Sequence, residues 1–380
     1  MDAYITDLAA FLPNEPVGND EIESVLGRIN HVSSKTRRIV LKNNGIRSRY
    51  YAIDPATGRL THTNAQLTAE AIRRLCPHPD FSVERIECLC CGTTSPDILF
   101  PGHGLMVLGE LEVAECEAVS MSGICISGMN ALKYACLSVA AGDSANAVAT
   151  GSELSGSFMR ASFFVPFLAD DPALENRPIK AFDADFLRWM LSDGAGAAYV
   201  VRDRPPDRAA LKVEWIETVS YAGRIETCMY GGGVKNEDGS VTGWRAIDEI
   251  DPAQAPYRFC VRQDIRLLDR EIVRTMGWAL RRAADKHGLE PESVDWFLPH
   301  YSSAYFRPKF MDEMDRIGFT VPEARWFTNL PEKGNTGSAA IFIILEELFH
   351  SGRLTPGQRI LCFIPESGRF SHCFMLLTAC

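Results

Sequence analysis

Three residues of this chain have side chains that could take part in nucleophilic chemistry. Cys125 lies in "SMSGICISGMNALKYA", His300 in "LPHYSS" and Asn335 in "GNTGSAA". A helix N-terminus or a nearby imidazolium lowers the pKa of a thiol from about 8.5 and makes it a nucleophile. Cys125 follows small residues that allow a tight strand-to-helix turn, and an apolar segment with helical spacing comes after it. The stretch therefore predicts a nucleophile at a helix start, with an inert buried thiol as the alternative.

His300 and Asn335 also have two interpretations each. His300 follows Pro299 where a strand is expected to end, so its ring either faces a cleft or makes a structural hydrogen bond. Asn335 either caps a helix or uses its side-chain N–H to stabilise an oxyanion. Taken singly, neither residue decides between a structural and a chemical role.

An internal repeat places these residues in register. "SVERIECLCCGTTS" from Ser82 and "SVDWFLPHYSS" from Ser293 each follow a helix-like stretch that carries an arginine pair. Cys125 comes 43 residues after Ser82, and Asn335 comes 42 residues after Ser293. The repeat predicts a duplicated strand–helix–strand–helix unit with a parallel-rich sheet in each half. Equivalent helix starts would then bring Cys125, His300 and Asn335 into one cleft.

The two halves are expected to meet in "VRDRPPDRAAL", between Val201 and Leu211, where adjacent prolines and charges interrupt the apolar pattern. We therefore predict an N-terminal half over residues 1–205 and a C-terminal half over residues 206–380. Cys125 belongs to the first half, and His300 and Asn335 belong to the second.

Composition excludes several other classes of protein. The 380 residues carry a formal charge of -10, which argues against nucleic-acid binding because phosphate recognition needs a basic field. The early acidic residues and the lack of a long apolar run predict a cytoplasmic protein that does not enter a membrane. The twelve cysteines, in apolar runs, are expected to be reduced thiols. The "CLCC" cluster, Cys88 to Cys91, is typical of a buried strand rather than of a metal site.

With these motifs in register, the chain resembles the thiolase-fold condensing enzymes, most closely the 3-oxoacyl-(acyl carrier protein) synthase III group. "NNGIRSRYY" resembles that group's Gly-Ile-Arg signature, and "LSDGAGAAYV" its Gly-Asp-Gly-Ala-Gly-Ala segment. "GICISG" matches the nucleophile turn, "LPH" the histidine and "GNTGSAA" the asparagine segment. The resemblance implies an α/β fold of two pseudo-symmetric βαβ-rich halves in a layered α-β-α-β-α architecture. It also implies a homodimer, with acyl-CoA or acyl carrier protein thioesters as substrates and no further cofactor.

The resemblance assigns a role to each of the three residues. Cys125 would accept an acyl group from a thioester, and His300 and Asn335 would bind the carbonyl oxygen of a malonyl- or β-oxoacyl-type thioester. The expected reaction is a Claisen-type condensation. Acyl transfer to a hydroxyl or an amine is the alternative, and a catalytically silent partner subunit is a third possibility that the presence of all three residues disfavours.

Two departures from the family pattern favour specialised polyketide or fatty-acid-derived metabolism over primary fatty-acid initiation. The Gln-Ala-Asn that usually follows the histidine is "YSS" here, so Ser303 replaces the supporting asparagine. The C-terminal Gly-rich turn becomes "PESGRF", which retains Gly368 and introduces Glu366 and Arg369. Ser303, Gly368 and Arg369 are therefore candidates for an oxyanion site or for the active-site rim.

Local basic residues could receive a phosphopantetheine arm or an acidic carrier protein. The candidates are Arg37 and Arg38 in "SSKTRR", and Arg307 and Lys309 in "FRPK"; solvated surface charge is the alternative. The apolar segment 158–171 resembles the family insertion that lines the acyl pocket across a dimer contact, with core packing as the competing explanation.

Overall fold

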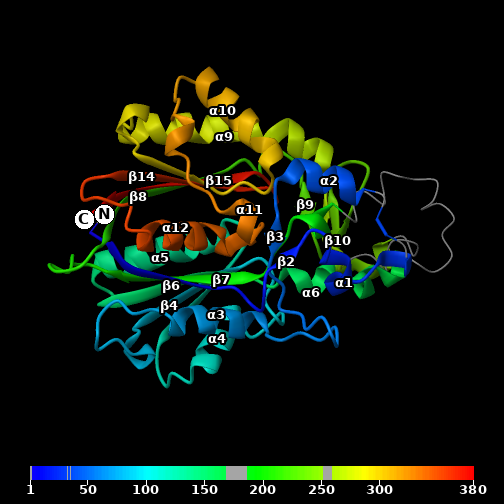
Figure 1. Ribbon diagram of the computed structural model, residues 1–380, viewed down its shortest axis with the longest axis horizontal. Helices are drawn as coiled ribbons and strands as arrows, with labels where there is room; N and C mark the ends of the chain where they lie inside the picture. The colour runs from blue at the N-terminus through cyan, green and yellow to red at the C-terminus, as the bar shows by residue number, and fades with distance from the viewer. Residues whose placement is uncertain (1, 32, 35, 168–185, 251–258) are drawn as a thin grey trace.

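Helices and strands alternate in five layers in the computed structural model, which describes residues 2–31, 33–34, 36–167, 186–250 and 259–380 (Figure 1). One outer layer is formed by α3 (Asn64–Arg73) and α4 (His103–Leu111), and the other by α9 (Ile265–His287) and α10 (Arg307–Arg316). Two helices fill the middle, α5 (Ser127–Ala141) and α12 (Ala340–His350). The predicted α-β-α-β-α architecture is confirmed.

The strands between these layers follow the same order in each half. The first set runs β5 (Glu117–Ser122), β4 (Cys88–Thr93), β6 (Asn146–Glu153), β7 (Gly194–Val201) and β1 (Tyr4–Phe11). The second set runs β13 (Trp296–Pro299), β14 (Arg359–Glu366), β15 (Ser371–Ala379) and β8 (Leu211–Ser220). In each set a parallel pair, β4–β6 or β13–β14, is followed by antiparallel strands. A short antiparallel pairing of β1 with β8 joins the two sets.

The second half has only a trace of a strand equivalent to β5. An isolated parallel bridge joins Phe297 in β13 to Trp326, and the Phe327 N–H donates to the carbonyl of Phe297 at 2.9 Å. The first half therefore ends in a six-residue edge strand, whereas the second half ends in a single bridge.

The two central helices are apolar around most of their surface because they are covered by sheets on both sides. Seven of the eleven residues of α12 are buried, including the whole run from Ala340 to Leu345. They share one apolar cluster with buried residues of α5, β6 and β14. A helix that is apolar all round is stable only inside a protein. This burial fixes the starts of α5 and α12 next to each other.

Several local predictions hold. The "CLCC" cluster lies in β4, all six residues of which are buried, and the Sγ atoms of Cys88 and Cys90 are 3.5 Å apart. "VRDRPPDRAAL" forms the connection between β7 and β8. In the described residues, no helix combines the length and apolar character that crossing a membrane requires.

Shorter elements gather at the end of the molecule where β6 and β14 finish (Figure 1). The helices among them are α1 (Ile22–Leu26), α2 (Arg37–Asn44), α6 (Ser155–Met159) and α11 (Leu330–Lys333). The strands form three antiparallel pairs: β2 (Val17–Gly18) with β3 (Ser48–Arg49), β9 (Met229–Tyr230) with β12 (Arg262–Gln263), and β10 (Gly233–Lys235) with β11 (Val241–Gly243).

Candidate active site

One cavity brings together residues from both halves of the chain. Cys125, His300 and Asn335 all line it, so the three side chains that the sequence singles out do share a site. Most of the remaining wall is apolar and comes from β9, α6, α9 and α10. These wall residues include Phe158, Met190, Met229, Leu268, Ile272, Phe306 and Phe310. A largely apolar cavity with a few convergent polar groups is typical of a site for a small acyl substrate.

Cys125 lies on the short connection between β5 and α5. Ile126 is the N-cap of α5, and the Ser127 N–H donates to the Ile124 carbonyl at 3.0 Å. Glycine is required close by: a Cβ on Gly128 would meet the carbonyl oxygen of Ser338 at 2.5 Å. The absence of a side chain there lets the start of α5 touch the segment that follows Asn335.

The thiol of Cys125 is held in its protonated form. Burial raises its pKa above the ordinary range, and the negative charges of Glu153 and Glu366 raise it further. Burial also lowers the pKa of His300 to about 4, so its ring is neutral near pH 7. The sequence raised the prospect of a helix start or an imidazolium lowering the thiol pKa; in the structure the net shift is upward. The resting site is a neutral thiol beside a neutral imidazole.

His300 follows β13 directly, and the main chain fixes its position. Its N–H donates to the carbonyl of Phe363 in β14 at 2.8 Å, which continues the β13–β14 pairing. The side chain is 3% exposed. A buried, neutral imidazole can donate one hydrogen bond to a substrate oxygen without carrying a charge.

Asn335 is anchored to the "LSDGAGAAYV" segment. Its N–H donates to the Met190 carbonyl at 3.0 Å, and its carbonyl accepts from the Ser192 N–H at 2.8 Å. Its side-chain Oδ1 accepts the Gly337 N–H at 3.0 Å, which leaves the Nδ2 amide group as a donor in the cavity wall. Ala339 is the N-cap of α12, so Asn335 does not cap that helix.

Sequence reasoning missed Glu153, the last residue of β6. It lines the same cavity, is 2% exposed, and burial raises its pKa to about 7. Its Oε1 accepts the N–H of Ser338 at 3.1 Å and the N–H of Thr94 at 3.2 Å. The signal in the sequence that could have indicated Glu153 is the acidic residue at the end of the small and apolar run "AVATGSE".

The candidate rim residues have different positions. Ser303 is buried, and its hydroxyl accepts the Tyr305 N–H at 3.3 Å, so it caps a short 3-10 helix. Gly368 accepts the Cys228 N–H at 2.8 Å through its carbonyl. Exposed Arg369 donates to the carbonyl of Ile225 at 3.2 Å. Ser302 and Ser367, rather than their predicted neighbours Ser303 and Gly368, line the cavity.

Glu366 and Arg369 interact through the main chain and not through their charges. The Glu366 carboxyl accepts hydrogen bonds from the N–H groups of Ile124, Gly368 and Arg369, and burial raises its pKa. No ion pair between the two side chains occurs in the described part of the chain. Glu366 therefore braces the nucleophile segment from the side of β14.

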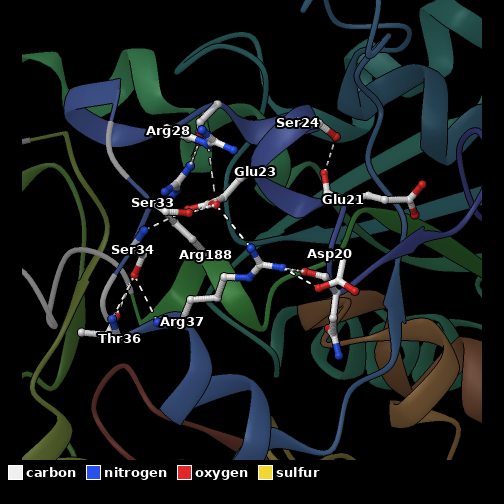
Figure 2. Close-up of polar contacts among 12 residues, drawn as sticks. Asp20, Glu21, Glu23, Ser24, Arg28, Ser33, Ser34, Thr36, Arg37 and Arg188 are labelled. Carbon is white, nitrogen blue, oxygen red and sulfur yellow. Dashed lines mark hydrogen bonds and ion pairs between the residues drawn. The ribbon is translucent and has the colours of Figure 1, made fainter.

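Four basic residues were predicted to receive a phosphopantetheine arm or a carrier protein, and three of them already form ion pairs with acidic side chains. Figure 2 shows Arg37 between Asp20 and Glu23, at 2.9 and 3.3 Å. Arg307 pairs with Glu323 at 2.8 Å, and Lys309 pairs with Asp269. Arg38, which is exposed on α2, makes no ion pair with any described residue and is the candidate best placed to meet an external anion.

The apolar segment 158–171 is only partly described, because residues 168–171 lie outside the described residues. Phe158 lines the cavity, Phe164 is buried, and Phe163 is 39% exposed. The first part of the segment therefore contains both a residue that lines the pocket and a residue that packs in the core.

Comparison with known proteins adds independent information. Residues 284–367 match the family described as 3-oxoacyl-[acyl-carrier-protein (ACP)] synthase III C terminal. The chain is 21% identical to beta-ketoacyl-[acyl-carrier-protein] synthase III of Chlorobaculum tepidum, over 95% of this chain and 94% of the relative. It is 24% identical to the enzyme of the same name from Bordetella petrii, over 94% and 93% of the two chains.

Solved structures share the fold over nearly the whole chain. AbyA1, a tetronic acid condensing enzyme, has a TM-score of 0.75 at 19% identity and covers 99% of both chains. A variant of OleA from Xanthomonas campestris has a TM-score of 0.76 at 19% identity, over 100% of this chain and 98% of the other. Structural likeness at this level of identity establishes the fold.

Proposed function

We propose that this chain, a thiolase-superfamily condensing enzyme of the 3-oxoacyl-(acyl carrier protein) synthase III type, carries an acyl group on Cys125 and joins it to a second thioester. The observation that supports this most directly is the single cavity lined by Cys125, His300 and Asn335. In the first step Sγ attacks the acyl thioester, the donor thiol leaves, and the proton of Cys125 passes to that thiol.

The second step would use the two neutral donors. A malonyl- or β-oxoacyl-type thioester would place its carbonyl oxygen between His300 and the Nδ2 group of Asn335. For a malonyl group, loss of CO2 leaves an enolate whose oxygen these donors stabilise. The enolate carbon then attacks the acyl carbonyl, the C–S bond to Cys125 breaks, and the released thiolate takes up a proton. Neutral donors suit this step because they leave the carbanion unprotonated.

Main-chain N–H groups are the proposed support for the oxyanion that forms on the acyl carbonyl. Cys125 supplies one of them, and Ser367 is a better second candidate than Gly368. Ser367 lines the cavity, whereas the Gly368 N–H already donates to the Glu366 carboxyl.

A homodimer is part of this proposal. β5 lies at an edge of the nine-stranded sheet with its side chains largely exposed, so it offers unpaired main-chain groups to a second copy. The loop between β4 and α4 exposes three consecutive apolar side chains, Ile98 (45%), Leu99 (66%) and Phe100 (78%), and Gly102 at its end lies close to Ser120 of β5. An exposed apolar cluster beside an open edge strand is a plausible contact surface between protomers.

We also propose the substrates of the protein and its cellular compartment. The relatives are named for acyl carrier protein, and we propose that a carrier protein or CoA delivers the acyl groups here, with the exposed Arg38 of α2 as a contact for it. The departures at Ser303 and Glu366 support a role in specialised metabolism. All twelve cysteines are free thiols, which supports a reducing compartment such as the cytoplasm.

Intact-mass measurement after incubation with a series of acyl-CoA donors tests the first step. We expect one acyl adduct per chain on the native protein and none on Cys125→Ala. Adding malonyl-CoA to the acylated protein should release CO2 and form a β-oxoacyl product. An adduct that survives Cys125→Ala would overturn the nucleophile assignment. Transfer of the acyl group to an alcohol or an amine without CO2 release would favour simple acyl transfer.

A further inference from the structure

Two glutamates close the equivalent strands of the two halves. β6 and β14 are each eight residues long, and they end at Glu153 and Glu366. The two strands occupy matching places in the repeated order, and their ends lie beside the candidate active site. Both carboxyls are close enough to Cys125 for their negative charges to disfavour its thiolate.

Glu153 connects the first half to the asparagine segment. Its Oε1 accepts the N–H of Ser338, three residues after Asn335, and the hydroxyl and N–H of Thr94 at the end of β4. Its aliphatic stem packs closely on Gly337, where an added Cβ would meet Glu153 Cγ at 2.6 Å. Gly337 in turn donates to Asn335 Oδ1, so the position of Glu153 controls the orientation of the Asn335 amide.

Glu366 has the complementary role on the other side of the cavity. Its carboxyl accepts the N–H of Ile124, the residue immediately before Cys125, and two N–H groups of its own turn. The resembled family has a Gly-rich turn here, so this brace depends on the glutamate that this chain carries. Glu153 thus holds the asparagine segment, and Glu366 holds the nucleophile segment.

No basic side chain lies in the cavity wall to offset the charge of this pair: Glu153 lines the wall, Glu366 follows the lining residue Pro365, and none of the described lining residues is lysine or arginine. The other titratable groups of the described wall are Cys125, Tyr301 and His300, which is neutral, and the buried Asp193 interacts with Glu153. Interactions between like charges are stronger in such a low-dielectric site than in water.

We propose that Glu153 and Glu366 are a pair of positioning residues that fix the asparagine and nucleophile segments in place and that, when ionised, their negative charges add to burial in keeping Cys125 in its thiol form in the empty cavity. This deepens the proposed function, since it rests on Cys125 as the nucleophile. The physical consequence is a site that is assembled for catalysis but slow to react with stray electrophiles.

The pH profile of Cys125 alkylation tests the electrostatic part. Iodoacetamide reacts with the thiolate: the S–C bond forms, iodide leaves, and the thiol proton goes to solvent, so the rate follows the thiolate fraction. The alkylation rate at Cys125 would be measured by mass spectrometry between pH 6 and 10, with fragment ions separating Cys125 from the other four cysteines of the same tryptic peptide. For the native chain we expect a midpoint above the value of about 8.5 for a free thiol.

Glu153→Gln and Glu366→Gln remove the charges while keeping an oxygen that can accept the same hydrogen bonds. Each variant should lower the midpoint by about one pH unit and make alkylation at pH 8 about tenfold faster. Glu346→Gln on α12 is the matched control, because burial also raises the pKa of Glu346 but it lies outside the cavity wall. Its profile should coincide with that of the native chain.

Unchanged midpoints in both glutamine variants would overturn the proposal. If Glu153→Gln does not fold, Glu366→Gln alone decides, since Glu366 ends β14 and is less buried than Glu153. Alkylation requires no acyl donor, so the test is separate from the proposed function. A chain that shows the predicted midpoints but forms no acyl adduct would contradict the function and support the inference.

Discussion

The two halves of this molecule share a strand order and differ in the chemistry they supply. The first half contributes a thiol on a turn that opens into the cavity, and the second contributes a buried imidazole and a buried amide. The equivalent strand ends meet, so that one half delivers the nucleophile and the other the neutral donors. The duplicated fold sets the geometry of the site, and the differences between the two halves decide which catalytic side chain each one contributes.

The outer edges of the halves differ in a similar way. The first half ends in the six residues of β5, while the second ends in the single Phe297–Trp326 bridge. A full edge strand is a surface that proteins cover with a partner or protect. The comparison therefore indicates which half would contact a second copy.

The largest expected effect comes from removing the donors of the second half while leaving the first half intact. Asn335→Ala should lower the rate of condensation by about 100- to 1,000-fold, because an enolate would lose one of its two hydrogen bonds. Acylation of Cys125 should continue, since that step does not use the amide. Single-turnover acylation and steady-state product formation, measured in parallel, separate the two steps.

Asn335→Asp sharpens this test. The carboxylate can still accept the Gly337 N–H but offers no Nδ2 donor. A variant that condenses as fast as the native chain would show that the amide donor has no role in the second step.

A smaller effect, on the free energy of unfolding, is expected for a substitution where the two halves touch. Gly151 in β6 has no room for a side chain, because an added Cβ would overlap the main chain of Ser338. Gly151→Ala should lower the free energy of unfolding by about 1–3 kcal/mol through overpacking. Gly109→Ala in α4 is the matched control: the added Cβ meets nothing within 4 Å, and alanine should stabilise that helix by about 0.5–1 kcal/mol. Chemical denaturation measures the free energy of unfolding of both variants. A value for Gly151→Ala equal to that of the native chain would show that the two halves tolerate separation at this point.

The last effect concerns how the stability of the fold depends on pH. His372 in β15 is buried, its Nε2 lies 2.7 Å from Thr275 Oγ1, and burial lowers its pKa to about 3. The unfolded chain, with a histidine pKa near 6.5, binds this proton more readily, so the stability that the neutral ring contributes is lost as pH falls from about 6.5 towards 3.

His372→Gln should therefore reduce the slope of unfolding free energy against pH by about 1.4 kcal/mol per pH unit between pH 4 and 6. Denaturant titrations at several pH values supply the slopes, and identical slopes for His372→Gln and the native chain would contradict the assignment.

The fold was largely predictable from the sequence because its signals are repeated. The spacing from Ser82 to Cys125 and from Ser293 to Asn335 is set by the length of equivalent strands and helices, so it survives divergence of the side chains. The Pro-rich segment near residue 205 interrupts the apolar pattern, and in the structure it connects β7 to β8. The division into residues 1–205 and 206–380 stays a prediction.

The finer arrangement of the site depended on tertiary contacts that local sequence does not encode. Ser303 and Gly368 were predicted at the cavity, yet their neighbours Ser302 and Ser367 line it: the Ser303 hydroxyl accepts the Tyr305 N–H instead, and Gly368 lies further along the turn that follows β14. Burial also reversed the expected direction of the Cys125 pKa. Glu153 was missed because a single acid at a strand end has no pattern of its own.

The main-chain bonds that attach Asn335 to Met190 and Ser192 also constrain the order in which the protein matures. Cys125 is translated 210 residues before Asn335, and Pro365 and Ser367 of the cavity wall follow later still. A nascent chain therefore carries its thiol for more than 200 residues of synthesis without the residues that complete the cavity. The segment from Asn335 to Ser367 decides when the cavity is complete.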